Sequence, residues 1–242
     1  MNERVRRLRQ ASLEANARIS TERAEMMTEF YGHSGEISAP VRRALAFKYL
    51  MENETVHIGD GELIVGERGP TPKATPTYPE LCCHSLQDLQ ILNDRKKISF
   101  AVDDQTRRTY QDKIIPFWRG RSMRDIIFAE MSDKWKAAYE AGVYTEFMEQ
   151  RAPGHTVLDD KIYRKGFLDF KADLEASLQS LDYHNDPEAY EKRKELEAMS
   201  ICCDAIIKFA ERHAEKARKM AQQEADPRRK AELDKIAEVC SH

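Results

Sequence analysis

The 242-residue sequence has no apolar run that approaches the ~20 residues needed to span a bilayer. Its first seven residues include three arginines and no apolar core, so we expect no secretory signal there. An excess of one charge is also missing, because 39 basic and 42 acidic residues leave a net charge of -3. Such a balance favours neither nucleic acid nor an anionic membrane as a partner. We therefore expect a cytoplasmic protein that binds neither.

Cysteine is scarce and its placement is irregular. The five cysteines comprise the adjacent pairs Cys82-Cys83 and Cys202-Cys203 and the single Cys240. An odd count with adjacent pairs argues against a secreted disulfide framework. Cys82-Cys83-His84 has side chains that can ligate a metal, but there is no Cys-x-x-Cys and adjacent cysteines seldom both reach one tetrahedral zinc. Buried reduced thiols are the favoured interpretation, with a metal site as the alternative.

Familiar motifs of nucleotide and hydrolase sites are also missing. The glycine-rich stretch 59–69 does not match Gly-x-Gly-x-x-Gly and does not lead into a helix, so it predicts no dinucleotide site. The Walker, Gly-x-Ser-x-Gly and His-Glu-x-x-His patterns do not occur. Arg119, Arg121 and Arg124 form a basic cluster, for which a solvated or ion-paired face is favoured over an anion site.

What the sequence does contain is helical periodicity along most of its length. An exception is the stretch 56–84, where Asp60-Gly61 predicts a turn between short strand-like runs and four prolines keep the following chain extended. We therefore expect a mainly α fold with a few short strands and no separate second domain. The helices are expected at residues 3–17, from about 20, from 40, from 85, from 103, at 125–131, 132–141 and 160–179, from 187 to about 224, and from 226.

The composition is polar for a free-standing domain of this size. Charged residues make up 33% of the chain and hydrophobic residues 41%, with a mean hydropathy of -0.70. A domain of such length normally buries most of its apolar side chains. Long exposed helices or a part of something larger both fit these values.

Residues 145–156, Thr-Glu-Phe-Met-Glu-Gln-Arg-Ala-Pro-Gly-His-Thr, are the stretch most suggestive of chemistry. Pro153-Gly154 breaks a helix there, and such breaks project side chains into clefts. Arg151 could clamp a carboxylate, Phe147 could line an apolar pocket, and His155 could protonate or hydrogen-bond a hydroxyl. Spacing alone favours the plainer alternative: a core Phe147, an ion pair of Arg151 with a glutamate such as Glu149, and a turn capped by His155.

Seven stretches together resemble the N-terminal part of the glycyl radical enzymes, the pyruvate formate-lyase-like family. Within that family the resemblance is closest to the trans-4-hydroxy-L-proline dehydratase branch. The matching stretches are Ile19-Ser20-Thr21-Glu22-Arg23-Ala24, Pro40-Val41-Arg42-Arg43-Ala44-Leu45, Gly61-Glu62-Leu63-Ile64-Val65-Gly66-Glu67, Pro76-Thr77-Tyr78-Pro79-Glu80-Leu81-Cys82-Cys83-His84, Ile114-Ile115-Pro116-Phe117-Trp118, residues 145–156 and Ile162-Tyr163-Arg164-Lys165-Gly166-Phe167.

The resemblance implies a ten-stranded α/β barrel wrapped in helices, of which residues 1–242 would be the N-terminal helical part of an incomplete catalytic domain. It implies a lyase in which a backbone glycyl radical generates a cysteine thiyl radical. A separate S-adenosylmethionine iron–sulfur activating enzyme installs the glycyl radical, in an anaerobic setting. The complete enzyme would be a homodimer, and its substrate a small molecule like hydroxyproline, dehydrated to a pyrroline carboxylate.

By the same resemblance, Phe147 would pack beside the ring of the substrate, and His155 would contact its hydroxyl as a catalytic and substrate-binding residue. The family's Gly-Cys-x-Glu and Arg-Val-x-Gly patterns are missing from this sequence. We therefore expect a chain that is inactive alone and needs the remaining enzyme in cis or in trans. The alternatives are another branch (diol or glycerol dehydratase, or sulfite-lyase) and a stand-alone helical interaction module.

Overall fold

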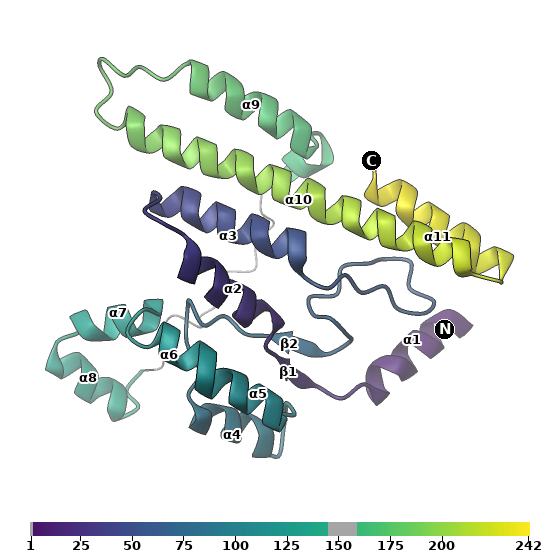
Figure 1. Cartoon of the computed structure of the whole chain (residues 1–242), viewed down its shortest axis with the longest axis horizontal. Helices are drawn as coiled ribbons and strands as arrows, with labels where there is room; N and C mark the ends of the chain where they lie inside the picture. The colour runs from purple at the N-terminus through teal and green to yellow at the C-terminus, as the bar shows by residue number, and fades with distance from the viewer. Residues whose placement is uncertain (1, 145–158) are drawn as a thin grey trace.

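The computed structural model describes residues 2–144 and 159–242, and it confirms a mainly α fold (Figure 1). The part of the chain described contains two strands, β1 (Arg18–Ser20) and β2 (Ala74–Pro76). Its helical elements are α1 (Glu3–Glu14), α2 (Glu22–His33), α3 (Ala39–Asn53), α4 (Leu86–Asp94), α5 (Asp104–Thr109), the π-helix η1 (Tyr110–Ile114), α6 (Ile115–Trp118), α7 (Met123–Glu130), α8 (Asp133–Glu140), the 3-10 helix η3 (Asp159–Tyr163), α9 (Phe167–Gln179), α10 (Ala189–Gln223) and α11 (Pro227–Cys240).

The helices begin where the sequence supplies side-chain caps. Ser85 and Asp88 form a reciprocal capping box at the start of α4. The carboxylate of Asp103 accepts a hydrogen bond of 2.7 Å from the Thr106 amide at the start of α5. At α11, Asp226 is the cap and Pro227 occupies the first turn, where its missing N–H costs nothing. These local signals explain why helix positions were largely predictable.

Helix α10 runs through one half of the molecule. Helices α3, α9 and α11 pack along it (Figure 1). Its 35 residues confirm the long helix expected from 187 to about 224. The side chains that it buries are mostly alanines, which let neighbouring helices approach closely.

No strand forms at residues 56–66, where a short strand or an extended pair was expected, but the turn expected at Asp60-Gly61 is present. Basic side chains of α10 and α11 take the carbonyls that a strand partner would otherwise bond. Lys216 donates to the carbonyl of Val56 at 2.8 Å, and just before this stretch Arg212 donates to the carbonyls of Met51 and Glu54, at the end of α3, at 2.7 and 2.6 Å. Side chains thus satisfy this backbone without a ladder.

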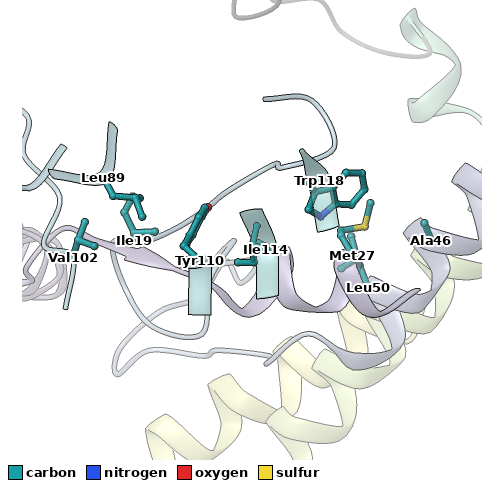
Figure 2. Close-up of a cluster of buried hydrophobic side chains, with 10 residues drawn as sticks. Ile19, Met27, Ala46, Leu50, Leu89, Val102, Tyr110, Ile114 and Trp118 are labelled. Atoms are coloured by element: carbon teal, nitrogen blue, oxygen red, sulfur yellow. The ribbon is translucent and has the colours of Figure 1, made fainter. Parts of the chain in front are cut away.

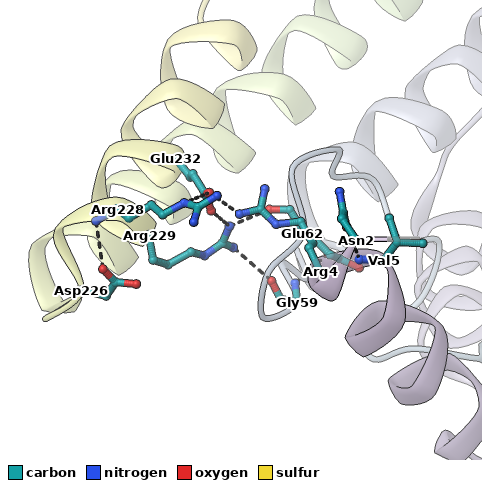
Figure 3. A network of polar contacts seen from close by, with 9 residues as sticks. All are labelled: Asn2, Arg4, Val5, Gly59, Glu62, Asp226, Arg228, Arg229 and Glu232. Carbon is teal, nitrogen blue, oxygen red and sulfur yellow. Dashed lines mark hydrogen bonds and ion pairs between the residues drawn. The ribbon is translucent and has the colours of Figure 1, made fainter.

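Arg229 of α11 continues the same pattern (Figure 3). Its guanidinium donates to the carbonyls of Glu62 at 2.7 Å and Gly59 at 3.2 Å, and it pairs with Glu232. Glu232 also pairs with Arg4 of α1, so the N-terminal helix is joined to α11. The glycine-rich loop is therefore held by a polar network of the fold.

A second group of buried side chains fills the other half of the molecule (Figure 2). Strand β1 pairs in parallel with β2, and its Ile19 amide donates to the Ala101 carbonyl at 3.0 Å. The rest of this core comes from α2, α3, α4, η1 and α6 and from Val102, which precedes α5. Its buried members are Ile19, Ala24, Met27, Ala46, Leu50, Leu89, Val102, Tyr110, Ile114 and Trp118.

Several predictions for residues near β1 and β2 were wrong because these strands pair with distant segments. The first helix ends at Glu14 rather than 17, and Ser20 lies in β1, so Thr21 is the residue that precedes α2. Pro76, one of the prolines expected only to keep the chain extended, is part of β2. In each case pairing between distant segments outweighs local propensity. The helix expected at 160–179 is split, since α9 begins only after Gly166.

Gly69 is buried at a place where no side chain fits. A Cβ added there would lie 2.2 Å from the backbone oxygen of Ala74 in β2. We expect Gly69→Ala to lower the free energy of unfolding by about 1–3 kcal/mol, because β2 must shift to accept the methyl group. Gly35→Ala is the matched control, since nothing lies within 4 Å of its added Cβ. Urea unfolding of both variants checks this, and equal midpoints would contradict it.

Candidate functional site

Phe147, Arg151 and His155, the side chains that the sequence singled out, lie outside the described residues, and their roles stay predictions. The structure does describe the chain on both sides of residues 145–158. On the N-terminal side α7 and α8 lead to Tyr144, and on the C-terminal side η3 leads into α9. The described chain on the N-terminal side ends at Tyr144, and its contacts are as follows.

Helix α8 ends in a turn that reverses the chain. Gly142 has a φ of 72°, in the left-handed region that glycine adopts without strain. Its amide donates to the Tyr139 carbonyl at 2.9 Å, and the next amide, of Val143, donates to the Ala138 carbonyl at 3.0 Å. This pair of bonds is the Schellman motif of helix C-termini. The turn directs Tyr144 back over α8.

Tyr144 lies on an aromatic surface of α8 that we call the aromatic anchor: Trp135, Tyr139 and Tyr144. Ring centroids are 5.3 Å apart for Trp135 and Tyr144, and 5.8 Å for Tyr139 and Tyr144. The Tyr144 hydroxyl donates to the backbone carbonyl of Trp135 at 2.9 Å. Two ring contacts and one hydrogen bond thus fix the residue that directly precedes the predicted substrate segment.

The aromatic anchor is joined to α7 by a further ring pair. Phe128 of α7 meets Tyr139 edge to face, with centroids 4.9 Å apart and planes at 83°. The guanidinium of Arg124 lies over Phe128, 4.3 Å from its centroid. Arg121 similarly lies over Phe117 at 4.7 Å. Two members of the basic cluster at 119–124 therefore pack on aromatic faces.

Helix α7 is bonded in turn to the stretch 77–84, which carries a matching motif of the family. The amides of Met123 and Arg124 donate to the carbonyls of Glu80 and Leu81 at 2.9 and 3.0 Å. Ser122, which is 1% exposed, caps α7 through the amide of Asp125. These bonds hold the start of α7 against an ordered loop.

Arg23 and Tyr110 hold that loop against the core. Arg23 pairs with Glu80, donates to the Thr77 carbonyl at 3.1 Å and lies 3.9 Å from the centroid of Tyr78. The fully buried Tyr110 donates its hydroxyl to Thr77 Oγ1 at 2.6 Å. Burial raises the pKa of Tyr110, so its hydroxyl remains a donor at neutral pH. A continuous set of contacts therefore runs from the core to Tyr144.

The stretch 75–84 also lines a pocket of about 300 Å³. Its walls are mostly apolar, and Cys82 and His84 are among the residues that line it. Such a lining suits a small apolar group better than a charged cofactor. The residues around the pocket are Ile19, Thr75, Pro76, Thr77, Tyr78, Leu81, Cys82, His84, Leu92 and Phe100.

The cysteines among the described residues form no disulfide with one another, and the pKa of Cys83 is strongly shifted. Burial, with the Asp125 carboxylate and Cys82 nearby, raises the pKa of Cys83 to about 12. That disfavours the thiolate form, which both metal ligation and nucleophilic attack require. Within residues 2–144 and 159–242 no group of three or more His, Cys, Asp or Glu side chains is placed to hold a metal.

This pKa predicts a slow reaction of Cys83 with iodoacetamide. At pH 8 its thiolate fraction should be about a thousandfold below that of a thiol at the reference pKa of 9.0, because a raised pKa keeps the proton on sulfur. Alkylation of Cys83, followed by peptide mass spectrometry, should still accelerate between pH 9 and pH 11. A plateau of the rate below pH 10 would contradict the assignment.

A family model described as pyruvate formate lyase-like matches residues 1–242. The chain belongs to the pyruvate formate lyase-like family. It is 53% identical to the trans-4-hydroxy-L-proline dehydratase of Clostridioides difficile over 239 residues, which are 98% of this chain and 30% of that protein. It is 33% identical to the isethionate sulfite-lyase of Nitratidesulfovibrio vulgaris, over 99% of this chain and 30% of that protein.

A solved structure of the pyruvate formate lyase-like family agrees with the fold. The chain superimposes on hydroxyproline dehydratase from Clostridioides difficile, with trans-4-hydroxy-L-proline bound, at a TM-score of 0.94 and 52% identity. The match covers 100% of this chain and 31% of that one. The family resemblance drawn from the motifs is therefore confirmed. The chain spans about 30% of the length of the curated relatives it matches.

Two features of the structure had not been predicted from the sequence. The aromatic anchor could have been found, because Gly142 directly follows a predicted helix and Trp135, Tyr139 and Tyr144 are spaced for one helix face and its return. The contacts of Arg212, Lys216 and Arg229 with distant carbonyls leave no local signal.

Among the described helices, none combines the length and apolar character that crossing a bilayer requires.

Proposed function

We propose that this chain forms part of the substrate-binding wall of a glycyl radical lyase that dehydrates trans-4-hydroxy-L-proline to a pyrroline carboxylate. The observation that supports this most is the match at a TM-score of 0.94 and 52% identity to a dehydratase with that substrate bound. Identity to the sulfite-lyase is much lower, at 33%. A pocket wall of the hydroxyproline branch is therefore the favoured assignment.

In this proposal Phe147 packs beside the pyrrolidine ring, and His155 contacts the 4-hydroxyl. An imidazole can donate a hydrogen bond to that oxygen or protonate it as it leaves, since its reference pKa is about 6.5. An aromatic ring excludes water from the apolar face of the substrate. The aromatic anchor supports the N-terminal end of this wall.

The radical chemistry falls to other residues in our proposal. A protein glycyl radical, installed by an S-adenosylmethionine iron–sulfur activating enzyme, would supply the abstraction of a substrate hydrogen. The thiols of this chain do not suit that role, because Cys82-Cys83, Cys202-Cys203 and Cys240 lie on separate elements and none lies in a Gly-Cys-x-Glu sequence. We propose that the remaining enzyme, in cis or in trans, carries those groups, and that residues 1–242 are inactive alone as part of one catalytic domain.

The test is anaerobic turnover of trans-4-hydroxy-L-proline, with pyrroline carboxylate as the measured product. The assembled enzyme, meaning this chain with the remaining polypeptide and the activating enzyme, should form product, and the chain alone should form none. Product from the chain alone would contradict the division of roles. Turnover of isethionate or a diol in place of hydroxyproline would favour the sulfite-lyase or diol dehydratase branch.

We further propose that the assembled enzyme is a homodimer and that it is located in the cytoplasm. A stand-alone helical module acting through α10 is less well supported, because α3, α9 and α11 already pack along that helix. The two cases differ in solution. A part of an enzyme should bind a hydrophobic dye through faces meant for absent strands, whereas a module should melt cooperatively without binding the dye.

A further inference from the structure

We infer that the groove between α1 and the loop at residues 59–64 is the docking surface for an amphipathic segment of the remaining enzyme polypeptide. The groove has a volume of about 980 Å³, and residues at the start of α11 also line it. The inference rests on one part of the proposed function, the assignment of the remaining enzyme to polypeptide in cis or in trans. It does not depend on which substrate that enzyme takes.

Helix α1 is nearly free of the rest of the described chain. None of its 12 residues is buried, and Arg4 and Leu8 are half-buried while the others are exposed. The ion pair of Arg4 with Glu232 ties it to α11 (Figure 3). A helix of this length is marginal in water by itself, because packing of an apolar face supplies most of the stability of a helix. Helix α1 therefore needs a segment that covers it.

The groove carries apolar side chains on two of its walls. Val5 and Leu8, three residues apart on one face of α1, line the first wall, and Leu63 and Ile64 of the loop line the second. Ile64 is 91% exposed, although Arg229 holds its loop through two backbone carbonyls. Apolar side chains that gather on a fixed, exposed surface mark an interaction site. Both walls thus offer apolar area to one occupant.

The charges of α1 indicate what else the occupant carries. The helix has four arginines and two glutamates. Arg7 lines the groove beside Leu8, and no carboxylate of the described chain pairs with its guanidinium. A carboxylate on the occupant would form a charge-assisted hydrogen bond with Arg7. The occupant is therefore a segment with apolar side chains for the walls and an acidic side chain for Arg7.

The length of the relatives favours the remaining enzyme polypeptide as the source of this segment. The chain superimposes over 100% of its length, α1 included, on a solved relative of which the match covers 31%, at a TM-score of 0.94. Helix α1 thus has the same position in a protein most of whose length lies outside the match. Because one ion pair does little to hold a helix, we assign the covering segment to that further length.

The first test measures amide hydrogen exchange in α1, in residues 1–242 alone and in the assembled enzyme. We expect exchange about tenfold slower or more in the assembled enzyme, because the covering segment must leave before the helix opens. Equal exchange in the two samples would overturn the inference. Exchange that slows in the chain alone as its concentration rises would assign the groove to a second copy, and would also overturn it.

The second test compares Leu8→Asp with Leu13→Asp in the assembled enzyme. Leu13 is the matched control, because it is a 60% exposed leucine of α1 that does not line the groove. Its position near the helix C-terminus is the less favourable one for a negative charge, so helix propensity cannot explain a larger effect at Leu8. We expect exchange in Leu8→Asp within about twofold of the chain alone, and slow exchange in Leu13→Asp. Equal protection in both variants would overturn the inference.

The third test concerns the acidic side chain of the occupant. We expect α1 to exchange about threefold faster in Arg7→Gln, the modest effect of one ion pair near the surface, and at the unaltered rate in Arg9→Gln. Arg9 is the matched control, because it is exposed and does not line the groove. Equal rates in the two variants would overturn the assignment of an acidic occupant.

Hydrogen exchange keeps this inference separate from the proposed substrate. An assembled enzyme that protects α1 but turns over isethionate or a diol would contradict the hydroxyproline assignment and support the docking surface. An assembled enzyme that dehydrates trans-4-hydroxy-L-proline while α1 exchanges as fast as in the chain alone would overturn the docking surface and leave the proposed function standing.

Discussion

Replacing His155 by alanine should lower the turnover of trans-4-hydroxy-L-proline by about 10²–10⁴-fold in the assembled enzyme, the range typical of a lost general acid or base. The physical reason is the poor leaving ability of an unassisted hydroxyl. If His155 donates a proton or a hydrogen bond to the 4-oxygen, its removal leaves the developing negative charge unsatisfied. The measurement is kcat from product formation under anaerobic conditions.

Two further histidine variants make this result specific. His184→Ala is the matched control, because His184 is an exposed histidine in the turn before α10, and it should leave turnover unchanged. His155→Gln keeps a hydrogen-bond donor but cannot deliver a proton. Turnover near the unaltered level in His155→Gln would indicate hydrogen bonding alone, and a loss equal to that of His155→Ala would indicate proton transfer. Unchanged turnover in both His155→Ala and Phe147→Ala would remove these residues from the active site.

Truncation of Leu89 should have the largest effect on stability, lowering the free energy of unfolding by about 3 kcal/mol in Leu89→Ala. Leu89 is fully buried on α4, in the same cluster as Ile19 and Val102 (Figure 2). Alanine there removes three buried carbons and leaves a cavity between elements that meet from distant parts of the chain. Urea unfolding, followed by circular dichroism, gives the change from the shift in midpoint.

Ile91→Ala is the matched control for Leu89→Ala. It removes the same number of side-chain carbons from the same helix, but Ile91 is 55% exposed. We expect a change of about 0.5 kcal/mol or less. Similar losses in both variants would contradict a specific role of Leu89 in the core, because alanine is the stronger helix former and does not weaken α4 through propensity.

Prediction from the sequence succeeded where the signal was local. The starts of α4, α5 and α11 follow from Ser85, Asp103 and Asp226-Pro227, whose side chains or rings act within one turn. The length of α10 follows from an uninterrupted helical pattern. The sequence motifs were also sufficient to identify the family, because seven separate stretches match it.

Prediction failed where distant segments decide the outcome. Nothing near residue 56 in the sequence shows that Lys216 will bond the Val56 carbonyl, so strand-like runs were expected where no strand forms. Pairing of Arg18 with both Ala74 and Ala101 likewise turned an expected helix start into β1. The aromatic anchor falls between these cases, since its spacing is local but its hydrogen bond requires the reversal at Gly142.

A crystal structure of the assembled enzyme with trans-4-hydroxy-L-proline bound would test the central claim most directly. The account predicts the His155 imidazole within hydrogen-bonding distance of the 4-hydroxyl and the Phe147 ring against the pyrrolidine. An imidazole that faces bulk solvent, far from the bound substrate, would contradict it.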